Sequence, residues 1–154
     1  MVDLYVEGKS EQEKDIMIRI PDWAQSFTLT INGEAQEIEC RPGTFAKLTK
    51  VWGNDEIHFE IGKKITVNHL PGSENMVAFM DGPVVLAGLC DEERTLFVNE
   101  GEAPEELLVA DNEREWGNWM NTYKTQHQER GIRFIPLNQV GYERYTVYFP
   151  IEKK

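Results

Sequence analysis

Short stretches that alternate apolar and polar residues recur along the first ninety residues, and each is followed by residues typical of turns. The stretch FTLTI at residues 27–31 alternates in this way and precedes Asn32-Gly33, a dipeptide that favours tight hairpins because both residues accept positive φ. The pattern returns at residues 45–51 and 57–61. Parallel strands need a crossover of a dozen or more residues, and stretches spaced this closely leave no room for one. The pattern therefore predicts an antiparallel β-sandwich.

The predicted fold class is all-β: an antiparallel, jelly-roll-like sandwich with an acidic loop or short-helix excursion around residues 100–128. We expect residues 1–90 to form the sandwich. Residues 91–154 are expected to contain the excursion and two closing strands, at 132–135 and 144–149, packed on the same sandwich. A chain of 154 residues is long enough to bury the core that such a fold requires.

The stretch ENMVAFMDGPVVLAG at residues 74–88 contains two apolar runs separated by Asp81-Gly82-Pro83. Asp-Gly is a strong turn dipeptide, and proline fixes φ at the point where the second run begins. Such a stretch suits either a catalytic loop or a buried bend between two strands. The residues favour the buried bend, because both flanking runs are apolar.

Acidic residues outnumber basic ones, and the formal net charge is −11. A chain of this charge is a poor partner for nucleic acid or an anionic membrane. The longest apolar run is far shorter than the ~20 residues of a membrane span. Residues 91–129 are the most acidic segment; they indicate a solvated loop or helix face rather than a Ca²⁺ site, because no Asp-x-Asp-x-Asp loop is present. No signal peptide is recognisable, and the sequence indicates no particular compartment.

No catalytic, metal-binding or cofactor-binding residue is predicted. The sequence contains neither Gly-x-Ser-x-Gly nor a glycine-rich phosphate loop, and no pair of its many carboxylates stands out. The three histidines lie in stretches typical of strands or polar loops. Cys40 and Cys90 are the only cysteines, and a zinc site built from these two would lack its usual third and fourth ligands. Two free thiols are favoured over a disulfide.

Aromatic residues are concentrated in one part of the acidic segment. Trp116, Trp119, Met120 and Tyr123 follow the spacing i, i+3, i+4 and i+7, which predicts one face of a helix. This stripe has two interpretations. Packing against a sheet is the favoured one, since such stripes usually face a core. The alternative is a carbohydrate-binding platform formed by Trp116, Trp119 and Tyr123, on which sugar rings would stack.

Several phrases, taken together and in order, resemble a known family. They are IRIPDWA (18–24), TLTINGE (28–34), VWGNDEIHFEI (51–61), the ENMVAFMDGPVVLAG stretch, IRFIPL (132–137) and ERYTVYF (143–149). They resemble the C-terminal β-sandwich region of glycoside hydrolase family 127, the β-L-arabinofuranosidase-like group once classed as a domain of unknown function. The closing third resembles a small companion domain found at the C-terminus of these proteins.

The resemblance implies a long protein in which an (α/α)₆ barrel precedes β-sandwich domains. It implies catalysis by a zinc-bound cysteine nucleophile and a glutamate acid/base in or beside the barrel. The family's adjacent cysteine pair has no match here, so no catalytic residue is carried over to this sequence.

The sequence thus predicts a non-catalytic accessory region of a family-127-like glycoside hydrolase. Its expected partner is the missing N-terminal catalytic barrel, which it would brace or whose cleft it would shape. Two alternatives remain open. One is an autonomous module that binds plant-type oligosaccharides, and the other is a purely structural domain that forms homo-oligomers.

Overall fold

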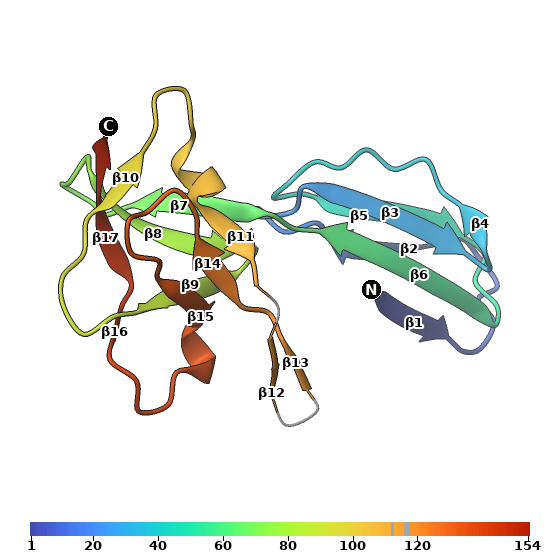
Figure 1. Cartoon of the computed structure of the whole chain (residues 1–154). Coiled ribbons are helices and arrows are strands. Elements are labelled where there is room, and N and C mark those ends of the chain that lie inside the picture. Colours follow the sequence, from blue (N-terminus) through green and yellow to red (C-terminus); the bar gives the residue numbers. More distant parts are fainter. Residues whose placement is uncertain (112, 116–117) are drawn as a thin grey trace. The chain divides into compact units, whose positions relative to one another are not determined.

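The computed structural model describes residues 1–111, 113–115 and 118–154, and it describes side chains outside residues 112–120. Nearly all its regular elements are strands, which confirms the predicted all-β class (Figure 1). The chain divides into two compact units, Met1–Lys64 and Ile65–Lys154, each with its own hydrophobic core. None of the helices in the described part of the chain has the length and apolarity that crossing a bilayer requires.

Unit 1 contains two antiparallel sheets. One has the strand order β1-β6-β3-β4, and β2 pairs with β5 in the other. The strands are β1 (Val2–Val6), β2 (Lys14–Arg19), β3 (Ser26–Ile31), β4 (Glu34–Ala35), β5 (Phe45–Lys50) and β6 (Asp55–Gly62). Both sheets contribute alternate residues to a single core, as a sandwich requires. The core side chains on these strands are Ile18, Ala46 and Leu48 from the two-stranded sheet and Phe27, Leu29, Ile57 and Phe59 from the other.

The predicted turn chemistry of unit 1 is present. Asn32 and Gly33 both adopt positive φ between β3 and β4. The Asn32 side chain then donates a hydrogen bond to the carboxylate of Asp55, at 2.7 Å. This carboxylate also accepts from Lys50 Nζ and from the backbone N–H of Gly53, both at 2.8 Å. These hydrogen bonds, with that from Lys50 foremost, lower the pKa of Asp55 to about 2.

Unit 2 is built around one large sheet with the order β10-β17-β8-β9-β15-β14-β11, to which β7 and β16 add by pairing with β8 and β9. A separate pair, β12 and β13, is antiparallel. The strands are β7 (Ile65–His69), β8 (Met76–Asp81), β9 (Val84–Leu89), β10 (Leu96–Val98), β11 (Leu108–Ala110), β12 (Glu113–Glu115), β13 (Asn118–Met120), β14 (Tyr123–Thr125), β15 (Arg133–Pro136), β16 (Tyr145–Thr146) and β17 (Tyr148–Lys153). Two short 3₁₀ helices, η1 (Pro104–Leu107) and η2 (Leu137–Gln139), complete the described elements.

The stretch at residues 74–88 forms the expected buried bend. It supplies β8 and β9, joined by a turn in which Gly82 has positive φ. Phe79 and Leu86 are fully buried in the core of unit 2. Phe79 packs edge-on against Phe134 of β15, with ring centroids 5.4 Å apart.

The position of the division between the units differs from the boundary expected at residue 90. β8 and β9 pair with β17, β15 and β16, which come from the last third of the chain. These long-range pairings place residues 76–89 in unit 2, so the structure divides after Lys64. The regular spacing of the strand signals conceals this division, because it does not reveal which strands pair.

The helix expected around Trp116 and Tyr123 is wrong for the described residues. β12 pairs with β13, with Arg114 opposite Trp119, and Tyr123 lies in β14 between β11 and β15. Tertiary strand pairing outweighs a helical spacing that is already weakened by Gly117 and Asn118, which are poor helix formers. The short helix of the acidic segment is instead η1, where the Glu106 carboxylate accepts a hydrogen bond from the backbone N–H of Ala103.

Candidate functional site

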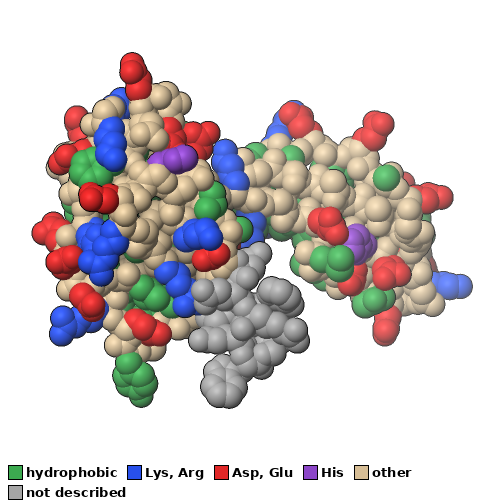
Figure 2. Space-filling model, in the orientation of Figure 1, with side chains coloured by type: hydrophobic (Ala, Val, Ile, Leu, Met, Phe, Trp, Pro, Cys, Tyr) green, Lys and Arg blue, Asp and Glu red, His purple; other side chains and the backbone are tan. Residues whose placement is uncertain are grey.

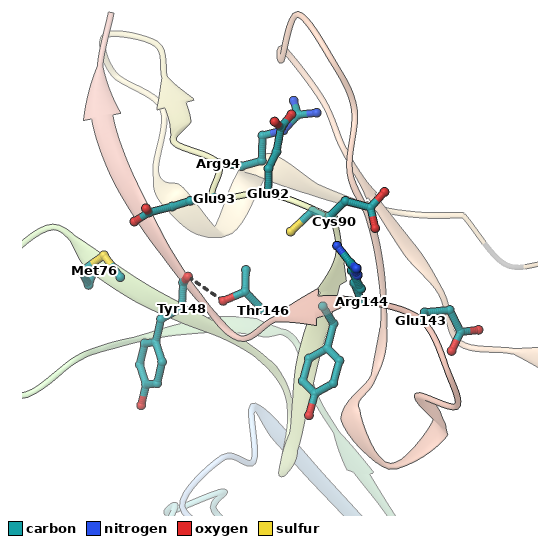
Figure 3. A pocket seen from close by; sticks show the side chains of 11 residues that line it. Met76, Cys90, Glu92, Glu93, Arg94, Glu143, Arg144, Thr146 and Tyr148 are labelled. Atoms are coloured by element: carbon teal, nitrogen blue, oxygen red, sulfur yellow. Dashed lines mark hydrogen bonds and ion pairs between the residues drawn. The ribbon is translucent and has the colours of Figure 1, made fainter.

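A hollow of about 610 Å³ lies in unit 2, beside the end of β9 (Figure 3). Its walls come from three segments that are far apart in the sequence: the start of β8, the chain that follows β9, and the chain that enters β16 and β17. The lining residues are Met76, Cys90, Asp91, Glu92, Glu93, Arg94, Glu143, Arg144, Tyr145, Thr146 and Tyr148.

Backbone pairing brings two of these segments together. In β16, Tyr145 lies opposite Leu89 and Thr146 opposite Gly88. The ladder is extended by a hydrogen bond from the Cys90 N–H to the Arg144 carbonyl, at 3.1 Å. Residues 90–94 and 144–146 are thereby held as neighbouring walls of the hollow.

Two tyrosines, Tyr145 and Tyr148, line the hollow although they are three residues apart. In an uninterrupted strand, side chains at i and i+3 point to opposite faces. Here a bend at Val147 separates β16 from β17, and the Thr146 hydroxyl donates across it to the Tyr148 carbonyl at 3.3 Å (Figure 3). The next residue, Phe149, is fully buried in the core. Tyr145 and Tyr148 keep 48% and 39% of their surface exposed.

The charged residues of the hollow fall into two groups. Glu92 and Glu143 already have partners within the protein. Glu92 lies 3.3 Å from Arg94 Nε and 3.7 Å from Arg130, while Glu143 accepts a backbone N–H from Gly141 at 2.9 Å. Backbone N–H groups at and just before Glu143 lower the pKa of its carboxyl. By contrast, Glu93 and Arg144 have no side-chain hydrogen bond or ion pair within the described part of the chain.

The thiol in the hollow is not activated. Cys90 is half-buried, and its Sγ lies 3.7 Å from the Gly88 carbonyl oxygen. Burial raises the pKa of the Cys90 thiol, whereas a catalytic cysteine needs a lowered pKa. Over residues 1–111, 113–115 and 118–154, no group of three or more His, Cys, Asp or Glu side chains is arranged to hold a metal ion.

The predicted aromatic platform is only partly described. Trp116 lies outside the described residues, and Trp119 is placed in β13 without a described side chain. Tyr123 is half-buried and packs against the core of unit 2. Burial, with a hydrogen bond to the Asp81 carboxylate, raises the pKa of Tyr123. Tyr123 thus has a packing role, and the platform itself stays a prediction.

Sequence reasoning did not single out Tyr145 and Tyr148 as neighbours at one site. The phrase RYTVYF predicts a closing strand, and in the structure Tyr145 lies in β16 and Tyr148 in β17. What the sequence does not reveal is the bend at Val147. The sequence does contain one indication of a break in alternation. Two aromatic residues lie three positions apart in this predicted strand, just after charged residues.

The fold defines a chain of two compact, mainly antiparallel β units. Residues 1–62, which make up nearly all of unit 1, match the family model described as the GH127 middle domain of β-L-arabinofuranosidase. A comparison with curated protein sequences gives no match.

Solved structures extend the likeness to both units. A structure described as a glycoside hydrolase matches with a TM-score of 0.67 and 17% identity, over 97% of this chain and 30% of its own. A GH127 β-arabinofuranosidase matches with a TM-score of 0.64 and 15% identity, over 97% and 30%. A GH127 β-L-arabinofuranosidase from Geobacillus stearothermophilus T6 matches with a TM-score of 0.62 and 18% identity, over 97% and 28%.

Over residues 1–62 the family model confirms the resemblance seen in the sequence phrases, and the solved structures show the same fold over both units. The chain spans less than a third of the length of the structures that it matches. The family model describes the part matched by residues 1–62 as a middle domain, whereas the sequence phrases were compared with a C-terminal region.

Proposed function

We propose that this chain is a non-catalytic accessory region of a longer, family-127-like glycoside hydrolase, and that it braces the catalytic barrel or shapes one wall of its cleft. One observation carries the proposal. The structural matches cover 97% of this chain but only 28–30% of the hydrolases that they come from. The remainder of such a protein would supply the catalytic machinery.

The surface of unit 1 supports a bracing role. Within the part of the chain that the structure describes, β1 pairs on one side only, with β6. Its residues Val2, Leu4 and Tyr5 are exposed. Apolar residues gathered on an edge strand are typical of a surface that another part of a protein covers. Acidic side chains are spread over the visible surfaces of both units, as Figure 2 shows.

The first test is a hydrolysis assay of the purified chain with aryl β-L-arabinofuranosides. We expect no turnover above the buffer background, because the proposal assigns catalysis to the barrel. Hydrolysis at an enzyme-like rate by the purified chain would overturn the assignment.

The second test uses the longer parent chain. Leu4→Asp is expected to lower the Tm and the activity of the parent enzyme, because it places a charge on the surface assigned to the barrel. Tyr142→Asp is the matched control, since Tyr142 is fully exposed and lies on unit 2. In the isolated chain, Leu4→Asp is expected to lower the Tm less than in the parent, because no barrel covers the strand there. Equal Tm and activity of the two parent variants would contradict bracing through β1.

A further inference from the structure

We propose that the hollow of unit 2 binds a neutral oligosaccharide, with Tyr145 and Tyr148 stacking against sugar rings and with Arg144 and Glu93 hydrogen-bonding to hydroxyl groups. This inference does not rest on the bracing role, because it concerns only residues of unit 2. It also assigns the sugar to residues other than Trp116, Trp119 and Tyr123.

The first argument is the placement of the two aromatic side chains. The bend at Val147 lets both tyrosines line the same hollow, while the neighbouring Phe149 fills the core. Aromatic side chains in a strand usually contribute packing area, and these two keep a large part of their surface exposed at a concave surface. A tyrosine ring with an apolar face and a polar edge suits a sugar, which has C–H faces and hydroxyl edges.

The second argument is the hydrogen-bonding capacity left unused among the residues that line the hollow. Arg144 presents a guanidinium group with five N–H donors, and Glu93 presents a carboxylate that only accepts. Neither has a partner among the described residues. Sugar hydroxyls both donate and accept, so one hydroxyl-rich ligand is able to satisfy both groups. Ligand sites typically combine aromatic lining with a few polar groups of this kind.

The third argument concerns the charge of the ligand. The lining contains four carboxylates and two guanidinium groups, on a chain of net charge −11, so an anionic saccharide is disfavoured. A basic peptide is less favoured than a neutral ligand, because Glu92 and Glu143 are already engaged by Arg94 and Arg130 and by backbone N–H groups. A neutral oligosaccharide requires no ion pair.

The experiment is a calorimetric titration of the purified chain with short arabino-, xylo- and cello-oligosaccharides at up to millimolar concentration. We expect saturable binding of at least one of them. Tyr145→Ala and Tyr148→Ala are each expected to weaken that binding by roughly tenfold, the loss of one good aromatic contact. Tyr142→Ala is the matched control and should bind as the unaltered chain does, since Tyr142 is fully exposed and does not line the hollow.

Tryptophan fluorescence separates the two carbohydrate sites. No tryptophan is among the described residues that line the hollow, so we expect binding there to leave the tryptophan emission nearly unchanged and Trp119→Ala to bind normally. A large emission shift together with loss of binding in Trp119→Ala would transfer the site to the aromatic platform and overturn the proposal.

Three other outcomes would also overturn the proposal. They are an absence of saturable sugar binding, sugar binding that both tyrosine variants retain, and preferential binding of an acidic saccharide or of an oligolysine probe. Circular dichroism and thermal unfolding of both variants should match those of the unaltered chain, because the two side chains are partly exposed. If either variant unfolds early, Tyr145→Phe and Tyr148→Phe, which keep the ring, should bind normally.

Discussion

Single residues in unit 2 are constrained by how closely aromatic rings approach the backbone. Gly88 lies in β9 opposite Phe134 of β15 and Thr146 of β16. A Cβ atom at this position would lie 2.9 Å from the Phe134 ring and closer still to the Phe149 ring. Both rings are fully buried, so neither is free to move aside.

We therefore expect Gly88→Ala to lower the free energy of unfolding by about 1–3 kcal/mol through overpacking. Denaturant unfolding followed by circular dichroism measures the change. Gly53→Ala is the control, because Gly53 has ordinary φ and open space where its Cβ would lie. A neutral effect of Gly88→Ala would show that the aromatic cluster accommodates a methyl group.

Among the elements, strand β1 is held in place in part by a contact between ionisable side chains. Besides its backbone pairing with β6, it is linked to that strand by a 2.6 Å contact between the Asp3 carboxylate and Nδ1 of His58. Glu60 lies 3.7 Å from the other ring nitrogen. The hydrogen bond to Asp3, reinforced by the charges of Asp3 and Glu60, raises the pKa of His58.

The sign of the pH dependence follows from that raised pKa. The histidine in the unfolded chain titrates near 6.5, so the stabilisation is fully present below this pH and is lost as the pH rises through the higher folded pKa. We expect amide hydrogen exchange in β1, corrected for the intrinsic rate, to become less protected above neutral pH. His58→Gln should remove this dependence. His69→Gln is the control, since the His69 ring contacts a backbone carbonyl at Glu74. Equal pH dependence in both variants would contradict this role.

An element is predictable from the sequence when local turn residues and alternation determine its structure. It is not predictable when pairing with a distant strand determines it. Strands ended by Asn32-Gly33 or by Asp81-Gly82 are recognisable, because the turn dipeptide and the alternation agree. The stretch around Tyr123 was not, because its helical spacing competes with strand partners more distant in the sequence, such as Phe134. The hollow could not be predicted for the same reason: its walls meet through the pairing of Tyr145 with Leu89.

At the scale of the whole molecule, the two units have separate cores. Ile57 is fully buried in the core of unit 1, and Phe134 in that of unit 2. Since the core clusters share no residue, each unit gains its burial energy from its own strands. Separate cores favour unfolding in two steps rather than in one.

We expect Phe134→Ala to destabilise unit 2 by about 3–5 kcal/mol while leaving amide protection in unit 1 unchanged. Ile57→Ala should do the reverse, at a cost of about 2–5 kcal/mol. Native-state hydrogen exchange measures both units in one sample. If either variant lowers protection throughout residues 1–154, the chain unfolds as a single cooperative body.

The bend at Val147 changes which side of the sheet the side chains after it face. Tyr145 lines the hollow before the bend, and Tyr148 lines it after the bend. With regular alternation, only one of the two tyrosines would face the hollow. The bend therefore places the second tyrosine there by altering the backbone, not by substituting a residue. We expect an insertion or deletion at this position to change which side chains line the hollow, while the strands on either side keep their pairing partners.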